Sequence, residues 1–396
     1  MHPQTYAYIR WPLAGSAVLA SFRAGRAKSD SDQQSRLMDA RVPAGITGAS
    51  KPTTMRDVAL EVGVSQSTVS RVLSGAPSRV PIAEETRRRV IEVAERLNYR
   101  PNPLARGLRG ARTMLIGAIV RDITDPFFAG AIEALSSEAM KLGYNLVLGH
   151  AHTRAEEAIA LRAILETRHC DALVVLGDVS DQPSLISDLH DATVPVVALW
   201  QGSRLQGVHS VNVDNRVGTN AVLDHLRTLG HHAIAYIGET RLRDLKERED
   251  AFVDYFGRTG IAIPDGYVRH ARNNHGGGGE ALSALLALPN PPTAVVASTD
   301  VLAIGALHTA HRSGLAVPDD LSITGFDDIA MAGFTVPALT TVRMPIYEMV
   351  GAALGIVIED LETLADRPSA GEARLMLKPS LVIRDSTGSP RIETRQ

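Results

Sequence analysis

Between residues 53 and 97, apolar residues recur at the three- and four-residue spacing of helices. A Thr-capped helix over 53–62 ends at Gly63, a second helix begins at the capping residue Ser65 and runs to about residue 73, and a third covers about 83–97. Three such helices can share one small core. The first two, joined by a tight turn that contains glycine, form the outline of a helix-turn-helix.

After residue 113, apolar runs of strand length alternate with helical segments. This alternation predicts parallel sheets with helices on both faces. Two sets of strands are expected, at 114–120, 145–149, 172–177, 194–200 and 208–213, and at 233–238, 266–270, 293–298 and 321–326. We therefore predict an α/β protein in which an all-helical headpiece precedes a core of two doubly wound lobes, whose ligands bind at the carboxyl ends of the strands.

Composition sets the boundaries between these parts. Residues 1–52 are partly polar and rich in Gly, Ser and Thr, so we expect a disordered extension. The headpiece takes 53–100, a proline-containing linker takes 101–112, and the core takes 113–385. The tail, 386–396, shows no apolar heptads, so we expect a dimer and not a tetramer held by a C-terminal coiled coil.

Positive charge is concentrated in the headpiece and linker. Residues 51–112 contain 12 Lys and Arg against 6 Asp and Glu, although the whole chain has a formal net charge of -3. In a helix-turn-helix, the second helix lies in the major groove of DNA. The alternative for such a helix is a solvated polar face. Side chains suited to base edges and phosphates are Ser65, Gln66, Ser67, Ser70 and Arg71.

Several functional classes lack their usual sequence signals. The single cysteine, Cys170, allows no intramolecular disulfide, and the histidine pairs lack partners at metal-ligand spacing. The glycine-rich stretch 273–280 lacks the ending of a phosphate-binding loop, and no apolar run reaches the about 20 residues of a membrane span. We expect no enzymatic activity, metal, cofactor or membrane association. The alternative class is the solute-binding protein of a transport system, which carries no basic headpiece.

Seven motifs resemble, in order, those of the lactose-repressor (LacI/GalR) family of bacterial transcription regulators: MRDVALEVGVSQSTVSRVLSG, LNYRPNPLARGL, DITDPFFAGAI, RTLGHHAIAYIG, STDVLAIGAL, SITGFDD and PALTT. The resemblance spans about residues 53–385. It implies a cytoplasmic, homodimeric repressor of palindromic operators, in which a hinge helix joins the headpiece to a periplasmic-binding-protein-like core that binds a small effector. Lobe 1 would comprise about 113–212 and 344–370, and lobe 2 about 213–343 and 371–385.

The resemblance also assigns roles in DNA binding. Gln66, Ser67 and Arg71 would read bases. Leu108 would be inserted as a wedge between base steps of the minor groove, which kinks DNA. The further expected residues are Asn102, Ala105 and Arg106 in the hinge, and Thr54, Thr68 and Asn98 in the headpiece.

The effector site is implied in the same way. Asp125, Phe127 and Phe128 match a ligand-contacting loop after the first core strand, where aromatic faces suit a sugar or a purine ring. An Asp in such a place can instead cap a helix. The other expected ligand contacts, at or after later strands, are Trp200, Arg248, Thr299, Asp300 and Asp327.

Two positions depart from the family pattern. Asp125 stands where the family usually has Asn, and Leu199 with Trp200 replaces an Asp-Arg or Asp-Trp pair. The missing acid removes an acceptor for a ligand hydroxyl. An effector with an apolar part therefore fits better than a free hexose, and we expect a sugar or sugar derivative, with a nucleobase as the alternative.

Overall fold

The computed structural model describes residues 53–74, 81–99, 112–151, 170–179, 183–200, 208–363 and 372–391. The chain divides into two compact units, residues 1–100 and 101–396. The expected N-terminal extension, the hinge residues Asn102, Ala105, Arg106 and Leu108, and the last five residues of the tail lie outside the described residues.

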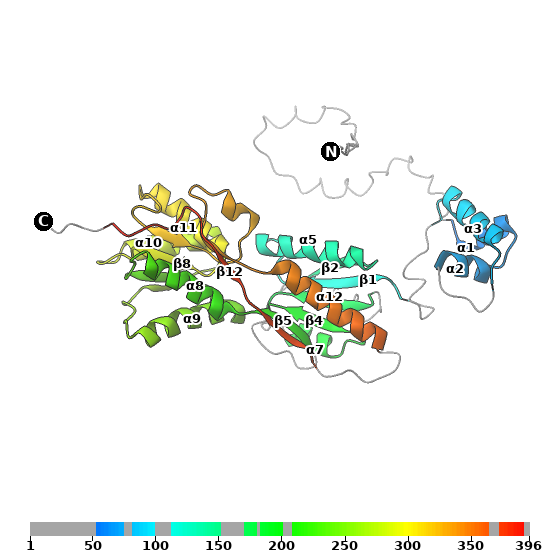
Figure 1. The fold of residues 1–396 in the computed structure, drawn as a ribbon, viewed down its shortest axis with the longest axis horizontal. Helices are drawn as coiled ribbons and strands as arrows, with labels where there is room; N and C mark the ends of the chain where they lie inside the picture. The colour runs from blue at the N-terminus through cyan, green and yellow to red at the C-terminus, as the bar shows by residue number, and fades with distance from the viewer. Residues whose placement is uncertain are drawn as a thin grey trace, which may run out of the picture. The chain divides into compact units, whose positions relative to one another are not determined.

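The first unit contains three helices, α1 (Met55–Val62), α2 (Gln66–Ser74) and α3 (Glu84–Arg96). Each buries a narrow apolar stripe, and Val58, Val69 and Val90 are completely buried in the shared core. Gly63 ends α1 with a φ of 78°, a left-handed conformation that glycine adopts without a Cβ penalty. The helical headpiece predicted from the apolar spacing is confirmed (Figure 1).

A six-stranded parallel sheet in the order β11-β5-β4-β3-β1-β2 forms the centre of the first lobe. Its strands are β1 (Leu115–Val120), β2 (Asn145–His150), β3 (Ala172–Leu176), β4 (Val196–Leu199), β5 (His209–Val213) and β11 (Arg374–Leu377). Val174 packs with α5 (Pro126–Lys141) and α12 (Ile346–Thr363), whereas Val175 packs with α7 (Pro183–His190). Successive side chains of a strand thus fill the cores on opposite faces of the sheet.

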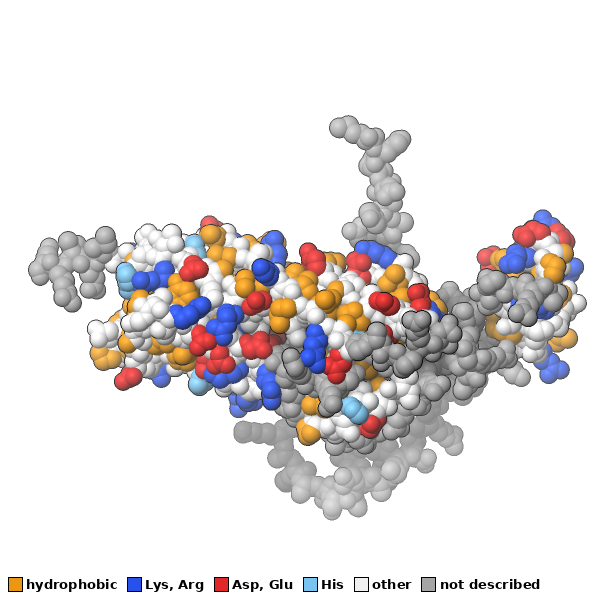
Figure 2. Space-filling model, turned by 60° about the horizontal axis from the view of Figure 1, so that its bottom comes forward, with side chains coloured by type: hydrophobic (Ala, Val, Ile, Leu, Met, Phe, Trp, Pro, Cys, Tyr) orange, Lys and Arg blue, Asp and Glu red, His pale blue; other side chains and the backbone are white. Residues whose placement is uncertain are grey.

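The second lobe has a four-stranded parallel sheet in the order β7-β6-β8-β9. Its strands are β6 (Ile234–Gly238), β7 (Val268–His270), β8 (Ala294–Ala297) and β9 (Ser322–Thr324). Helices pack in two pairs, which Figure 1 shows on opposite sides of the sheet: α8 (Asn215–Thr228) with α9 (Arg243–Thr259), and α10 (His275–Leu286) with α11 (Asp300–Arg312). Both lobes are doubly wound, as predicted. On the face shown in Figure 2, basic and acidic side chains are intermixed over the core.

The chain passes between the lobes three times, after β5, β10 (Thr341–Arg343) and β11. An antiparallel pairing of β10 with β12 (Ser380–Val382) joins two of these crossings (Figure 1). The structure corrects one expected boundary, because residues 371–385 do not all belong to the second lobe. β11 pairs in parallel with β5 at the edge of the first sheet. The chain then returns to the second lobe, where the backbone N–H of Ile323 donates to the carbonyl of Ser386 at 2.9 Å.

Candidate DNA-binding helix and ligand cleft

The side chains of α2 that were expected to read DNA are partly engaged within the helix. Ser65 Oγ accepts a hydrogen bond from the backbone N–H of Thr68 at 3.1 Å and lies 2.7 Å from Ser67 Oγ. Arg71 Nε donates to the carbonyl oxygen of Ser67 at 3.2 Å. Gln66 is exposed and has no hydrogen-bond partner among the described residues. Its amide is therefore free to bind another molecule.

Two other expected DNA contacts lie at helix ends. Thr54 is the N-cap of α1, since its Oγ1 accepts from the backbone N–H of Asp57 at 3.4 Å while the Asp57 carboxylate accepts from the backbone N–H of Thr54 at 2.8 Å. Asn98 follows α3 with a φ of 49° and is exposed. Ser70 is half-buried on α2. These placements give Thr54 a local structural role, and contact with DNA stays a prediction for all three residues.

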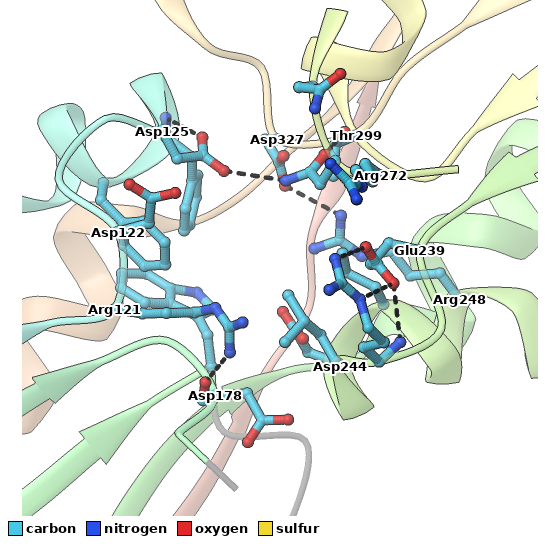
Figure 3. Close-up of a pocket in the computed structure, with 18 of the residues that line it drawn as sticks. Arg121, Asp122, Asp125, Asp178, Glu239, Asp244, Arg248, Arg272, Thr299 and Asp327 are labelled. Carbon is cyan, nitrogen blue, oxygen red and sulfur yellow. Dashed lines mark hydrogen bonds and ion pairs between the residues drawn. The ribbon is translucent and has the colours of Figure 1, made fainter. Parts of the chain in front are cut away.

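A cavity of about 340 Å³ lies between the two lobes of the core (Figure 3). Most of its lining side chains come from segments at the carboxyl ends of strands, where doubly wound sheets bind ligands. The first lobe contributes Arg121, Asp122, Asp125, Phe127, Phe128, Asp178 and Trp200. The second lobe and the crossing after β10 contribute Glu239, Arg241, Leu242, Asp244, Leu245, Arg248, Arg272, Asn273, Asn274, Thr299, Asp327 and Met344.

Arg248, on α9, is the best-connected side chain of this lining. It is only 3% exposed, and its Nη1 donates to the carbonyl oxygen of Ser298 at 2.5 Å and to Asp327 Oδ1 at 3.1 Å. Its Nε donates to Asn215 Oδ1 at 2.9 Å, and its guanidinium lies 3.7 Å from the centroid of the Phe326 ring. Because several groups hold the guanidinium in one orientation, Arg248 presents a charge of defined direction to the cleft.

Burial raises the pKa of several carboxyls that line the cavity, among them Asp327 and Asp125. Burial raises the pKa of Asp327 well above its ordinary value, although the charge of Arg248 acts in the opposite direction. Burial also raises the pKa of Asp125, which caps α5 by accepting from the backbone N–H of Phe127 at 3.0 Å. Asp125 therefore caps a helix and also lines the cavity, and its contact with a ligand stays a prediction.

An aromatic wall closes the side of the cavity that belongs to the first lobe. The ring centroids of Phe127 and Trp200 lie 4.9 Å apart, those of Phe127 and Phe128 lie 5.3 Å apart, and both pairs are edge-to-face. All three rings are buried, and Trp200 is 3% exposed with a φ of 58°. The cluster offers apolar surface to a ligand.

Thr299 and Asp300 are adjacent in sequence but lie in different environments. Thr299 lines the cavity, and its Oγ1 donates to Asn273 Oδ1 at 2.6 Å. Asp300 is fully buried outside the cavity lining, where it accepts from the backbone N–H of Ile329 at 2.8 Å and from Thr341 Oγ1 at 2.5 Å. The expectation that Asp300 contacts the ligand is therefore corrected, because its carboxyl is used to join loops within the second lobe.

The sequence reasoning missed most polar residues of the cavity, namely Arg121, Asp122, Asp178, Glu239, Arg241, Asp244, Arg272, Asn273 and Asn274. A positional signal was present for many of them. Arg121 and Asp122 follow β1, Asp178 follows β3 after one glycine, and Glu239 directly follows β6. A search for every polar residue within two positions of a strand end would have found these four.

Other reactive chemistry is sparse in the described parts of the chain. Cys170 is buried, and burial raises the pKa of its thiol to about 11, so it stays protonated at neutral pH. Within the same residues, no group of three His, Cys, Asp or Glu side chains is placed to hold a metal ion, and no helix has the length and apolar character needed to cross a bilayer.

A helix-turn-helix unit on the same chain as a two-lobed core with a ligand-sized cleft defines the class of DNA-binding regulators controlled by small molecules. A family model of bacterial regulatory proteins of the lacI family matches residues 54–102, and a model of a periplasmic binding protein-like domain matches residues 223–387.

Two curated relatives extend this likeness to most of the chain. The HTH-type transcriptional repressor CytR of Escherichia coli (strain K12) is 33% identical over 336 residues, which cover 84% of this chain and 96% of that protein. The HTH-type transcriptional regulator GalR of the same strain is 32% identical over 344 residues, covering 86% and 97%. The lac repressor dimer solved with operator and the anti-inducer ONPF has a TM-score of 0.75 at 26% identity, covering 85% of this chain and 100% of that one. The chain belongs to the LacI family of bacterial transcription regulators, as its motifs predicted.

Proposed function

We propose that this protein is a cytoplasmic, homodimeric repressor whose binding to a palindromic operator is controlled by a small hydroxylated effector in the interlobe cavity. The observation that carries the proposal is a cavity lined by both lobes, with an oriented charge and an aromatic wall, on a chain that also has a helix-turn-helix. The two curated relatives described above are transcriptional regulators, which supports a role without enzymatic activity. The helix-turn-helix also argues against the solute-binding alternative.

Sequence reading is proposed to depend on α2. Gln66, exposed and without a partner in the described chain, would pair with a base edge, and Ser67 and Arg71 would extend the contact. Further contacts with the DNA would come from Thr54, Ser65, Thr68, Ser70 and Asn98. The hinge residues would enter the minor groove, with Leu108 as the wedge.

The cavity lining favours a sugar-sized ligand with an apolar part. Arg248 and Asp327 offer a donor and an acceptor for hydroxyl groups, and Phe127 and Trp200 offer ring faces or edges. The volume of about 340 Å³ falls near the lower end of typical small-molecule sites. A sugar derivative therefore fits best, and a nucleobase is the alternative that the aromatic wall also suits.

Coupling between effector and DNA is proposed to act through the angle between the lobes. Hydrogen bonds between described residues cross the cleft: Asn273 Nδ2 donates to Asp125 Oδ2 at 3.1 Å, and the backbone N–H of Arg243 donates to Asp178 Oδ2 at 2.8 Å. A ligand that competes for these groups, or adds contacts to both lobes, changes the relative stability of open and closed arrangements. It can do so only as far as its affinities for the two arrangements differ.

The second copy of the dimer is proposed to cover an apolar surface near η1 (Ala330–Gly333). Met331 is 57% exposed, Phe334 82% and Val336 95%, which is costly for large apolar side chains so close in sequence. A two-fold dimer places two headpieces for the two halves of a palindrome.

Selection from randomised duplex DNA with the full-length protein tests this proposal. The enriched sequences should contain an inverted repeat, and DNase protection should cover both halves of it. The variant Gln66→Ala should relax the preference at a single position of each half-site, whereas Arg258→Ala, an exposed change on α9 of the core, should leave it unchanged. Enrichment of no sequence, or of a site without internal symmetry, would contradict the proposal.

A further inference from the structure

One carboxylate oxygen of the cleft is buried without a hydrogen-bond partner in the described part of the chain. Asp244 lies in the first turn of α9, and its Oδ1 is buried with no hydrogen-bond partner among the described residues. The indole Nε1 of Trp200 is also buried without a hydrogen-bond partner among the described residues, and this residue is 3% exposed. Both residues line the interlobe cavity and also an adjoining cavity of about 260 Å³. Most buried polar atoms in proteins have a partner, so two unpaired atoms that both line a cavity point to a partner that comes from outside the protein.

Neighbouring carboxylates of the cavity are satisfied within the protein. Asp122 accepts from the backbone N–H and the hydroxyl of Thr124 at 2.8 and 2.6 Å. Both oxygens of Glu239 accept from Arg241, at 3.0 and 2.7 Å. Asp327 pairs with Arg248, as described above. Among these carboxylates, the buried oxygen that lacks a hydrogen-bond donor from the described residues is therefore the one at Asp244.

Asp178 adds a second acid at this place from the opposite lobe. Figure 3 shows Asp178 and Asp244 at the same end of the cavity, away from Asp125 and Asp327. Burial raises the pKa of Asp244, and the charge of Asp178 raises it further, whereas Arg248 and Arg121 oppose the shift. Arg121 Nη1 donates to the carbonyl oxygen of Asp178. In the absence of a ligand, ionisation of Asp244 is thus disfavoured.

We propose that the effector carries a protonated amine, which binds at Asp244 and Asp178 beside the ring of Trp200. This inference rests on the proposed function, because it concerns the ligand of the same cavity. An ammonium group has three N–H donors, so it can serve carboxylates of both lobes together, whereas a hydroxyl donates a single hydrogen. An aromatic ring adds attraction for a cation but not for a neutral hydroxyl. The ligand class is therefore an amino sugar or a similar amine-bearing polyol.

The adjoining cavity adds a third acid, Glu247, and is also lined by Arg248 and Arg374. Glu247 lies one turn after Asp244 on α9, lines this second cavity, and accepts from Asn215 Nδ2 at 2.9 Å. Arg374, the cation that β11 contributes there, is ion-paired with Glu372. An amine at Asp244 would thus have a second acid in each cavity, Asp178 in the first and Glu247 in the second.

Calorimetric titration of the full-length protein with matched ligands tests the inference. Glucosamine and galactosamine are each compared with the parent sugar and with the N-acetylated derivative, which share the ring but lack the charge. At least one amine should bind at least about tenfold more tightly than its two neutral counterparts, the gain expected for a charge-assisted hydrogen bond. In a Trp11→Phe background, Trp200 is the single tryptophan, and its fluorescence should change with the same affinity.

Variants on one helix separate the amine site from general effects. Asp244→Asn should remove most of the preference for the amine, with a loss of about tenfold or more in its affinity. Asp250→Asn, on the exposed side of α9, should retain the preference. If Asp244→Asn unfolds at a lower temperature than the parent, Asp244→Ser is measured in its place. Binding of neutral sugars as tight as that of their amines, no amine binding, or full amine affinity in the Asp244 variant would overturn the inference. DNA selection is scored separately, so an operator-binding protein that ignores amines contradicts only this inference.

Discussion

Arg248 shows, at the residue scale, how one side chain can serve both the fold and the site. Its partners come from α8, from the end of β8 and from the loop after β9, so the charge links three segments of the second lobe. The family motif predicted a ligand contact there. It did not predict that the guanidinium would be 3% exposed and surrounded by protein groups, because these come from segments distant in sequence.

Arg248→Ala should therefore impair stability as well as effector response. Removal of the guanidinium leaves Asp327 buried without its counter-charge, which costs about 3 kcal/mol in comparable buried pairs. The free energy of unfolding in urea should fall by about that amount. Arg258→Ala, near the exposed end of the same helix, is the control and should change it little. If the Arg248 variant is as stable as the parent, the Arg248–Asp327 pair does not stabilise the fold.

Asp300 provides a pH-dependent prediction. Burial raises its pKa from 3.8 to about 7, so between these values the folded protein retains a proton that the unfolded chain releases. The free energy of unfolding contributed by this group therefore falls as pH rises from about 4 to 7. Unfolding curves at several pH values should show a steeper fall for the parent than for Asp300→Asn. The absolute stability of the variant is not diagnostic, since it also loses an acceptor; parallel slopes would contradict the prediction.

Residue roles were predictable where a motif or a chain position identified them. Asp125 and Thr299 were identified because they match ligand-contacting positions of the family motifs, and both line the cavity. Asp300 follows the same strand as Thr299 but points into the lobe, since adjacent residues at a helix start face different directions. Asp244 carries no strand-end signal, because it lies in the first turn of a helix.

At the scale of elements, the stability of α2 depends on the cap that Ser65 provides at its first turn. Ser65 Oγ accepts from the backbone N–H of Thr68, and the helix that follows must hold Gln66 in a fixed direction to read a base. The end of such a short helix is stabilised by its cap more than by its length.

Ser65→Ala should destabilise the headpiece by about 1 kcal/mol, the usual cost of losing a capping side chain. Hydrogen exchange of the amides in α2 should become faster in the full-length protein. Ser65→Asp retains an acceptor at the same place and should restore slow exchange, which distinguishes capping from a direct contact to DNA. Exchange rates equal to those of the parent in the alanine variant would show that Ser65 does not cap α2.

Elements were predictable in proportion to their burial. The strands at the sheet centres, such as β1, β3 and β8, are continuous apolar runs and were located within one or two residues. Three strands were missed: β10, β11 and β12. β10 and β12 have three residues each, which is too short for a recognisable pattern. β11 is exposed over most of its length, so its sequence lacks the apolar run of a buried strand. The two-lobe boundary was wrong at 371–385 for the same reason.

At the scale of the whole molecule, the proposed dimer determines how tightly DNA is bound. Two headpieces on one palindrome bind with an advantage in effective concentration that a monomer lacks. Phe334→Glu places a charge in the middle of the proposed contact.

Phe334→Glu should shift the protein to a monomer in sedimentation measurements and weaken operator binding by about a hundredfold. Val253→Glu introduces the same charge at another exposed apolar position, on α9, and should leave the dimer intact. A Phe334 variant that stays dimeric would locate the interface elsewhere on the core.

The central claim is that the cleft and the operator site are thermodynamically coupled, and one pair of titrations tests it directly. The affinity of the full-length protein for its selected operator is measured with and without saturating effector, and the affinity for the effector is measured with and without operator. Coupling requires the same factor in both directions, and a regulator of this class should show about fivefold or more. A factor of one, with both ligands bound to the same protein molecule, would contradict the account.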